Sequence, residues 1–138
     1  MKVFLDTNVL VSATATRGLC ADVLREVLIH HQLVIAEPLL AELRNALCRK
    51  LGVPEDFICE LIEILQKDSL FSTSSTLLDI DIQDSDDVII LSCALNGKAD
   101  LFITGDKELL NLGKIGNMEI VSPRVFWEKL KAQSPDEL

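Results

Sequence analysis

Basic residues are scarce in this sequence. Lysine and arginine together number 13 against 22 aspartates and glutamates, so the formal net charge is −9 and the sequence pI is about 4.6. A protein that binds nucleic acid through a basic face usually has the opposite balance. Either nucleic acid is not the ligand, or part of the acidity is clustered to hold divalent cations, which change the local charge. The net charge alone does not decide between these two interpretations.

The features of membrane and secreted proteins are also missing. No apolar run approaches the ~20 residues that a membrane-spanning helix requires. Asp6 interrupts the first apolar segment too early for a signal peptide. We therefore expect a cytoplasmic protein that makes no contact with a membrane.

Zinc ligands are in short supply as well. The four cysteines are widely separated, and no two of them form a CxxC pair. The two histidines, His30 and His31, are adjacent at the end of an apolar helical pattern, and neighbours on a helix point apart. These absences argue against a structural zinc site and favour buried free thiols.

The length and the apolar pattern indicate one α/β domain. With 138 residues, of which 49% are hydrophobic, the chain can bury a substantial core. We assign residues 1–131 to a single domain and expect residues 132–138 to be a frayed tail. Apolar runs typical of strands cover Lys2–Leu5 and residues 33–36, 101–103 and 118–121. Because helical patterns alternate with these runs, we predict a three-layer α/β/α sandwich around a central, mostly parallel sheet of four to five strands.

The helical patterns and the loops complete this outline. Apolar residues at helical spacing cover residues 19–28, 39–50, 55–66, 107–111 and 123–130. Ser122 is a good N-cap for the last of these helices, and Pro123 suits its first position. We expect polar or glycine-rich loops at residues 14–18 and 113–117, and an extended segment over residues 77–83.

The chain is organised around residues 84–109, DSDDVIILSCALNGKADLFITGDKEL. This stretch reads as an acidic helix start, a buried helix, a turn, a strand and a loop that contains Asp106. Strand ends of a parallel sheet lie along one edge, where ligands bind. Asp87 and Asp106 are expected to converge at that edge, provided that residues 77–83 deliver the helix start to it.

Two further carboxylates are expected at the same edge. Asp6 directly follows the first strand, and Glu42 lies one turn into the helix after the second strand. At about 100° per residue, Glu42 falls beside the apolar arc of its helix and is half-sheltered. Taken alone, Glu42 is better explained as a boundary residue that pairs with a surface arginine. Asp84 and Asp86 are better explained as helix-start charges that the helix dipole favours.

Four carboxylates at one edge repel each other unless a cation lies between them. Their hard oxygen ligands suit Mg²⁺ or Mn²⁺, and such ions usually serve phosphate chemistry because they polarise phosphoryl oxygens and activate water. Polar groups that could position a phosphate or a water are Thr7, Asn8, Thr104 and Gly105. Basic residues that are candidate phosphate contacts, or only solubilising surface, are Arg17, Arg44, Arg49, Lys98 and Lys107.

Four segments carry a family resemblance. They are FLDTNVLVSA (residues 4–13), AEPLLAELRNAL (36–47), DSDDVIILSCALNGKADLFITGDKELL (84–110) and IVSPRVFWEKL (120–130). In order and spacing they resemble a PIN domain, and in particular the small prokaryotic PIN proteins that are toxins of toxin–antitoxin systems. The similarity covers nearly the whole chain.

The resemblance implies a metal-dependent endoribonuclease that hydrolyses RNA phosphodiester bonds with Mg²⁺ or Mn²⁺ and has an antitoxin protein as partner. It assigns catalysis and metal binding to Asp6, Glu42, Asp87 and Asp106, and polar support of the site to Asn8 and Thr104. The subgroup often has proline where this chain has Ser85, and commonly a polar residue where this chain has Val88. These departures leave the choice between Asp86 and Asp87 open.

The apolar segment VIILSCAL, residues 88–95, is apolar all round, so we expect one side to face the sheet and the other a second subunit of a homodimer. Two other functional classes stay open. One is a non-catalytic RNA-binding or protein-interaction domain of the same fold. The other is a receiver- or phosphatase-like magnesium-binding domain, although Asp6 is not part of a DxD motif and no predicted strand carries a suitable lysine.

Overall fold

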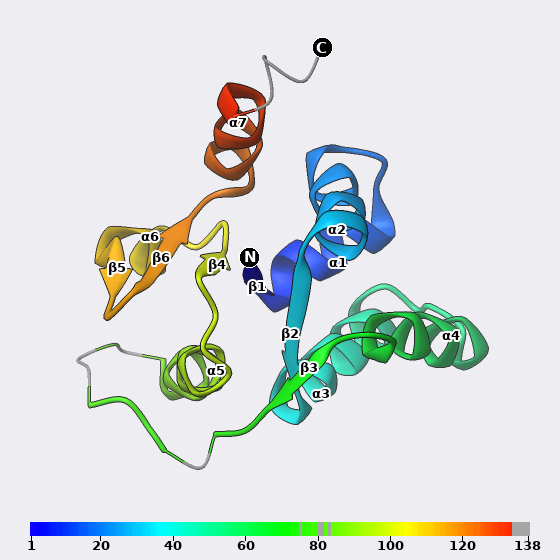
Figure 1. The fold of residues 1–138 in the computed structure, drawn as a ribbon. Helices are drawn as coiled ribbons and strands as arrows, with labels where there is room; N and C mark the ends of the chain where they lie inside the picture. Colours follow the sequence, from blue (N-terminus) through cyan, green and yellow to red (C-terminus); the bar gives the residue numbers. More distant parts are fainter. Residues whose placement is uncertain (75, 80–81, 83, 134–138) are drawn as a thin grey trace.

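A computed structural model describes residues 1–74, 76–79, 82 and 84–133 (Figure 1). The strands are β1 (Lys2–Leu5), β2 (Gln32–Ala36), β3 (Leu70–Ser72), β4 (Leu101–Ile103), β5 (Lys114–Ile115) and β6 (Met118–Val121). The helices are α1 (Thr7–Ala15), α2 (Leu19–His30), α3 (Glu37–Asn45), the π-helical turn η1 (Ala46–Lys50), α4 (Glu55–Gln66), α5 (Ser85–Asn96), α6 (Lys107–Leu112) and α7 (Pro123–Gln133).

The strands form one six-stranded sheet in the order β3-β2-β1-β4-β6-β5. All neighbours are parallel except β5 and β6, which form an antiparallel pair. In the centre, Leu5 of β1 pairs with Ile103 of β4, so the carboxyl ends of these two strands lie side by side. The residues that follow them, Asp6 and Thr104, therefore start at the same edge of the sheet.

Helices cover both faces of this sheet. Figure 1 places α1, α2 and α4 on one side and α5 on the other, and α7 packs against α2. The central strands are consequently buried on both faces, which explains their continuous apolar runs. Phe4 and Phe102 stack across β1 and β4 with their ring centroids 5.4 Å apart. The predicted mixed α/β fold with a mostly parallel central sheet is confirmed.

Several details of the prediction were wrong. The sheet has one strand more than the four to five expected, because β5 pairs with β6 inside the supposed loop at residues 113–117. Helix α1 begins at Thr7, where only polar strand-end residues were expected, because Asp6 caps it. The extended segment expected at residues 77–83 stays a prediction, because residues 80, 81 and 83 lie outside the described residues. Helix α7 includes Ala132, so the tail cannot start there, and residues 134–138 also lie outside the described part.

Helix α5 is largely covered by its own chain. Its residues 90–94 are buried, and the Ser92 hydroxyl accepts a hydrogen bond from the backbone N–H of Leu78 at 2.9 Å. At its C-terminal end, a Cβ on Gly97 would lie 2.6 Å from a methyl group of Val34, so only glycine lets the helix end this close to β2. The face of α5 that was expected to meet a second subunit is therefore partly occupied by the segment that precedes the helix.

No helix in the described part of the chain is long and apolar enough to cross a bilayer.

Candidate active site

Asp6 is held at the end of β1 by three hydrogen bonds. Its backbone N–H donates to the carbonyl of Ile103 at 3.0 Å, which continues the pairing of β1 with β4. Its Oδ1 accepts from the N–H of Thr7 at 2.8 Å, and its Oδ2 accepts from the hydroxyl of Thr104 at 2.8 Å. Burial raises the pKa of Asp6, while the bonds from Thr104 and Thr7 oppose the rise and nearby Asp106 adds to it.

Thr104 joins the loops that carry two of the predicted carboxylates. Its side chain is fully buried at the end of β4, donates to Asp6 and accepts from the N–H of Asp106 at 3.0 Å. Asp106 in turn caps α6, because its Oδ1 accepts from the N–H groups of Glu108 and Leu109 at 2.8 and 3.3 Å. Thr104 thus orients Asp6 and Asp106, and it is not among the residues that line the pocket described below.

Glu42 turns toward the site and not toward a surface arginine. The hydroxyl of Thr7 donates to its Oε1 at 2.6 Å, whereas Arg44, two residues further along α3, forms an ion pair with Glu55. Burial raises the pKa of Glu42; the Thr7 bond opposes this, and the charges of Asp6, Asp86 and Asp84 reinforce it. The explanation of Glu42 as a boundary residue paired with an arginine was therefore wrong.

The start of α5 brings three more carboxylates to the same place. Asp84 is the N-cap, and its Oδ1 accepts from the N–H of Asp86 at 2.9 Å, as its expected role at the helix start requires. Asp87 lies half-buried in the first turn. Burial, followed by the charges of Asp84, Asp6, Asp106 and Glu42, raises the pKa of Asp87 to about 7. Asp87 therefore senses the charge of every other predicted ligand.

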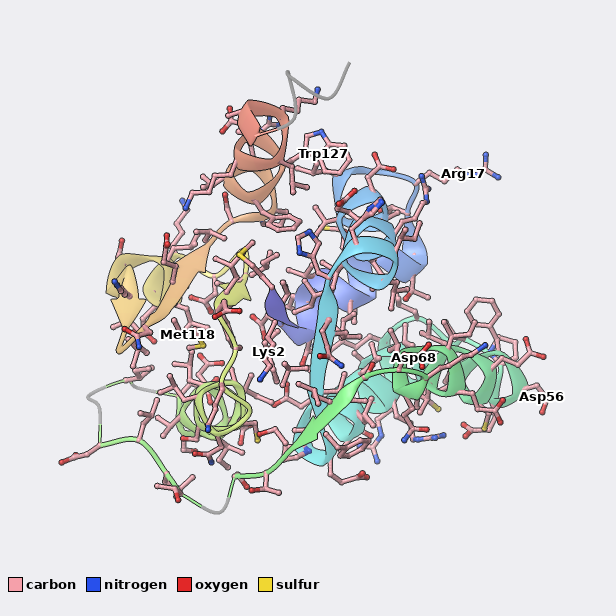
Figure 2. All side chains as sticks on the ribbon, in the orientation of Figure 1. Lys2, Arg17, Asp56, Asp68, Met118 and Trp127 are labelled. Atoms are coloured by element: carbon pink, nitrogen blue, oxygen red, sulfur yellow. The ribbon has the colours of Figure 1, made fainter. Side chains whose placement is uncertain are left out.

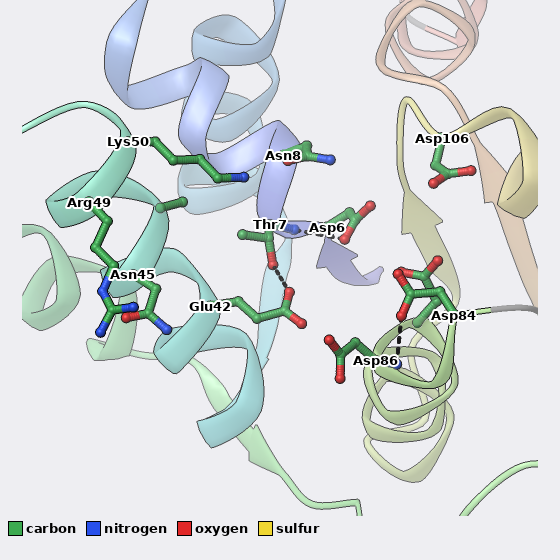
Figure 3. A pocket seen from close by; sticks show the side chains of 12 residues that line it. Asp6, Thr7, Asn8, Glu42, Asn45, Arg49, Lys50, Asp84, Asp86 and Asp106 are labelled. Carbon is green, nitrogen blue, oxygen red and sulfur yellow. Dashed lines mark hydrogen bonds between the residues drawn. The ribbon is translucent and has the colours of Figure 1, made fainter.

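These groups surround one cavity of about 380 Å³ (Figure 3). It is lined by Asp6, Thr7, Asn8, Glu42, Asn45, Ala46, Arg49, Lys50, Asp84, Asp86, Asp87 and Asp106. All four predicted carboxylates and Asn8 are brought together here. Asp86 also lies in the cavity, across from Glu42, so the structure keeps both Asp86 and Asp87 near the centre.

Only some of the basic and polar residues that were predicted to contact a ligand line the cavity. Of the five candidate cations, Arg49 lines the cavity, whereas Arg17 projects away from the body in the loop between α1 and α2 (Figure 2). The hydroxyls of Thr7 and Thr104 donate hydrogen bonds to the carboxylates of Glu42 and Asp6, so these hydroxyls orient site residues and do not donate to a ligand. Lys50 was missed altogether, because an α-helical projection turns it away from Glu42.

The donor set fits a hard divalent cation in its chemistry. In the described residues no group of three or more His, Cys, Asp or Glu side chains is already arranged to hold a metal ion. Yet six carboxylates line the cavity, burial and then neighbouring carboxylates raise the pKa values of Asp6, Glu42 and Asp87, and the carboxylate donors are all oxygens. Mg²⁺ and Mn²⁺ prefer such ligands. Asp6, Glu42, Asp87 and Asp106 are the residues that would hold the ion.

The fold and this cavity define an α/β protein with an acidic site at the carboxyl edge of its sheet. Residues 2–108, which include all of these carboxylates, match the family model described as the PIN domain. The chain belongs to the PIN domain family, and the family resemblance noted in the sequence is confirmed.

One solved structure with a similar fold is VapBC2 from Rickettsia felis, which is bound to a DNA fragment from its own promoter. The match has a TM-score of 0.61 at 16% sequence identity and covers 88% of this chain and 98% of that chain. At this identity the likeness concerns the fold alone. No curated protein matches the chain.

Proposed function

We propose that this protein is a metal-dependent endoribonuclease that hydrolyses phosphodiester bonds of RNA with Mg²⁺ or Mn²⁺. The observation that carries the proposal is the gathering of six carboxylates around one cavity at the carboxyl edge of the sheet. Membership of the PIN domain family supports it. The acidic cavity also accounts for part of the net charge of −9, which taken alone argued against a nucleic-acid ligand.

In this proposal Asp6, Glu42, Asp87 and Asp106 hold the ion. When bound, it would supply polarisation of the phosphoryl oxygen and a lower pKa for water. The chain's own polar groups fix where that chemistry takes place. Thr104 holds the Asp6 carboxylate against rotation, and Thr7 does the same for Glu42. The caps of α5 and α6 keep the remaining carboxylates at the mouth of the cavity.

The biological role that we propose is the toxin of a toxin–antitoxin system, with an antitoxin protein as partner. The motifs shared with small prokaryotic PIN toxins support this role, and so does the fold shared with VapBC2. A homodimer is part of the proposal, although the burial of α5 within its own chain weakens the original reason for it. Light scattering of the purified protein, alone and with the product of an adjacent gene, tests both assemblies.

The chemistry is tested with a labelled single-stranded RNA and the substitution Asp6→Asn. We expect cleavage in Mn²⁺ or Mg²⁺, none in EDTA, and a fall of at least ~100-fold in the variant, because a charged ligand is lost where transition-state charge develops. Asp56→Asn is the matched control, since Asp56 is an exposed carboxylate in the first turn of α4, away from the cavity (Figure 2). Cleavage by Asp6→Asn at the rate of the wild type in Mn²⁺ would refute the assignment.

A non-catalytic RNA-binding or protein-interaction domain is the second candidate, and the lack of a ready-made group of metal ligands among the described residues favours it. Titration calorimetry with Mn²⁺ separates the two, because a non-catalytic domain would bind no ion at Asp6 and Asp87. A receiver-like domain fits less well. The parallel strands β1, β2, β3, β4 and β6 are followed by Asp6, Glu37, Thr73, Thr104 and Ser122, none of which is the lysine that it needs.

A further inference from the structure

The cavity has a basic wall that the acidic residues do not explain. Arg49 and Lys50 are the two basic residues among those that line it, and both belong to η1. In Figure 3 the two side chains lie on the side opposite Asp84 and Asp106, with Asp6 and Glu42 between the two sides. The cavity therefore has an acidic and a basic end.

The π-helical turn η1 is what places Lys50 there. In a continuous α-helix, each residue advances about 100°, so Lys50, eight positions after Glu42, would point about 80° away from it. A π-turn closes i→i+5 hydrogen bonds, so each residue advances less far, and Lys50 falls back on the side of Glu42. Figure 3 agrees, because Lys50 extends toward Asn8 while Arg49 lies beside Asn45 at the rim.

Both cations are free to meet a ligand. Their side chains are exposed, and neither forms an ion pair with any described carboxylate. Arg44 on the preceding helix and Lys129 on α7, by contrast, are each paired with a glutamate. Two unpaired cations on one wall of a cavity with six carboxylates are positioned to attract an anion that reaches past the acidic end.

We propose that Arg49 and Lys50 bind a backbone phosphate of the RNA next to the phosphate that is hydrolysed. This inference rests on the proposed ribonuclease function and names the part of the substrate that the second wall of the cavity recognises. A single strand whose scissile phosphate lies among the carboxylates presents its neighbouring phosphate one nucleotide further along, toward η1. The substrate must then be an oligonucleotide that extends beyond the scissile bond on the η1 side.

Kinetics with the double variant Arg49→Gln/Lys50→Gln test this assignment. A contact made equally in the ground state and the transition state raises KM and leaves kcat unchanged. We expect KM for a single-stranded RNA to rise at least ~10-fold with kcat nearly constant, since phosphate contacts by cations supply most of the affinity for a nucleic-acid backbone. Arg25→Gln/Lys67→Gln removes the same charge from two exposed positions, one in α2 and one directly after α4, and should change neither constant.

A substrate modification locates the phosphate. RNAs with one neutral methylphosphonate linkage are compared at each position flanking the cleaved bond. For the wild type one flanking position should raise KM by about the same factor as the double variant, and the double variant should lose nothing further at that position. Unchanged KM in the double variant, a fall in kcat instead, or a wild type insensitive at every flanking linkage would each overturn the proposal.

A binding measurement separates this proposal from the nuclease assignment. Fluorescence anisotropy with Asp6→Asn protein and uncleaved RNA gives the slope of log affinity against log salt. Removing both cations should reduce that slope by about 0.7, the value for one phosphate contact on a single strand. If the wild type fails to cleave but this slope changes, the nuclease function is wrong and the phosphate site stands. If cleavage occurs and the slope does not change, the phosphate site is wrong.

Discussion

The two edges of the sheet treat their charged residues in opposite ways. At the amino edge, the Asp100 carboxylate accepts a hydrogen bond from the backbone N–H of Lys2 at 2.9 Å, and burial lowers the pKa of His31, which favours its neutral form. At the carboxyl edge, carboxylates are gathered with one another, and the pKa values of Asp6 and Asp87 are raised. One edge satisfies its charges and the other concentrates them.

This difference separates the contribution of a residue to stability from its contribution to function. Repulsion among like charges destabilises the fold, so an arrangement that keeps it requires a compensating ligand or use. The hydrogen bonds from Thr104 and Thr7 hold the acidic groups in place despite that repulsion. Changes at the carboxyl edge should therefore affect cleavage more than folding, and changes at the amino edge should do the reverse.

The largest test of this comparison is Asp87→Asn against Asp100→Asn. Each removes one negative charge, from the carboxyl and the amino edge respectively. Asp87→Asn should reduce cleavage at least ~100-fold, because a charged group is lost from the reaction site, yet raise the melting temperature without metal because repulsion is relieved. Asp100→Asn should leave cleavage unchanged and not raise the melting temperature. Equal effects of the two variants on cleavage would break the comparison.

A smaller effect is expected for Thr104→Val, which keeps the shape of the side chain and removes the bond to Asp6. Cleavage should fall by about 10-fold, since support of a metal ligand typically contributes 10–100-fold in metal affinity or activity. Thr14→Val is the matched control, because the Thr14 hydroxyl donates to the carbonyl of Leu10 in the same helix and Thr14 is not among the residues that line the cavity. Manganese titrations of both variants measure whether the loss lies in metal affinity. An unchanged rate in Thr104→Val would mean that Asp6 needs no support.

Much of the fold and of the acidic site could be predicted from the sequence. Strands buried on both faces give continuous apolar runs, and the residue after such a run, such as Asp6, lies at the carboxyl edge by topology alone. Helix α1 was missed because Asp6 and Thr7 were taken as polar residues that end a strand. The same residues are also an N-cap signal, which could have revealed it.

Other features leave no mark that a single sequence reveals. The hydrogen bond between Thr7 and Glu42 joins residues 35 positions apart, and its existence depends on how α1 and α3 pack. A π-turn has no composition rule comparable to a cap, so no pattern in the sequence indicated that Lys50 lines the cavity. The choice between Asp86 and Asp87 stays a prediction, because both line the cavity, Asp87 half-buried and Asp86 exposed.

The pH dependence of stability offers the finest comparison of the two edges. The folded pKa of Asp87 is raised to about 7 from an ordinary value of 3.8, so without metal the folded state takes up a proton that the unfolded chain does not. Stability should therefore rise as the pH falls from 8 toward 4, by about 1 kcal/mol once solvent screening of a half-exposed group is allowed for. Urea unfolding in EDTA at successive pH values measures it.

His31 at the amino edge should act in the opposite direction. Burial, the main cause, lowers its pKa below the ordinary 6.5, and Glu26 only partly opposes this. Protonation of the unfolded chain below pH 6.5 therefore reduces stability, so the gain from Asp87 should be visible mainly between pH 8 and 6.5. With His31→Gln, the rise in stability with falling pH should extend to lower pH, and with Asp87→Asn that rise should be smaller. With Mn²⁺ bound, stability should instead be greater at high pH. A stability that falls steadily from pH 8 to 6.5 in EDTA would show that the carboxyl edge holds no excess charge.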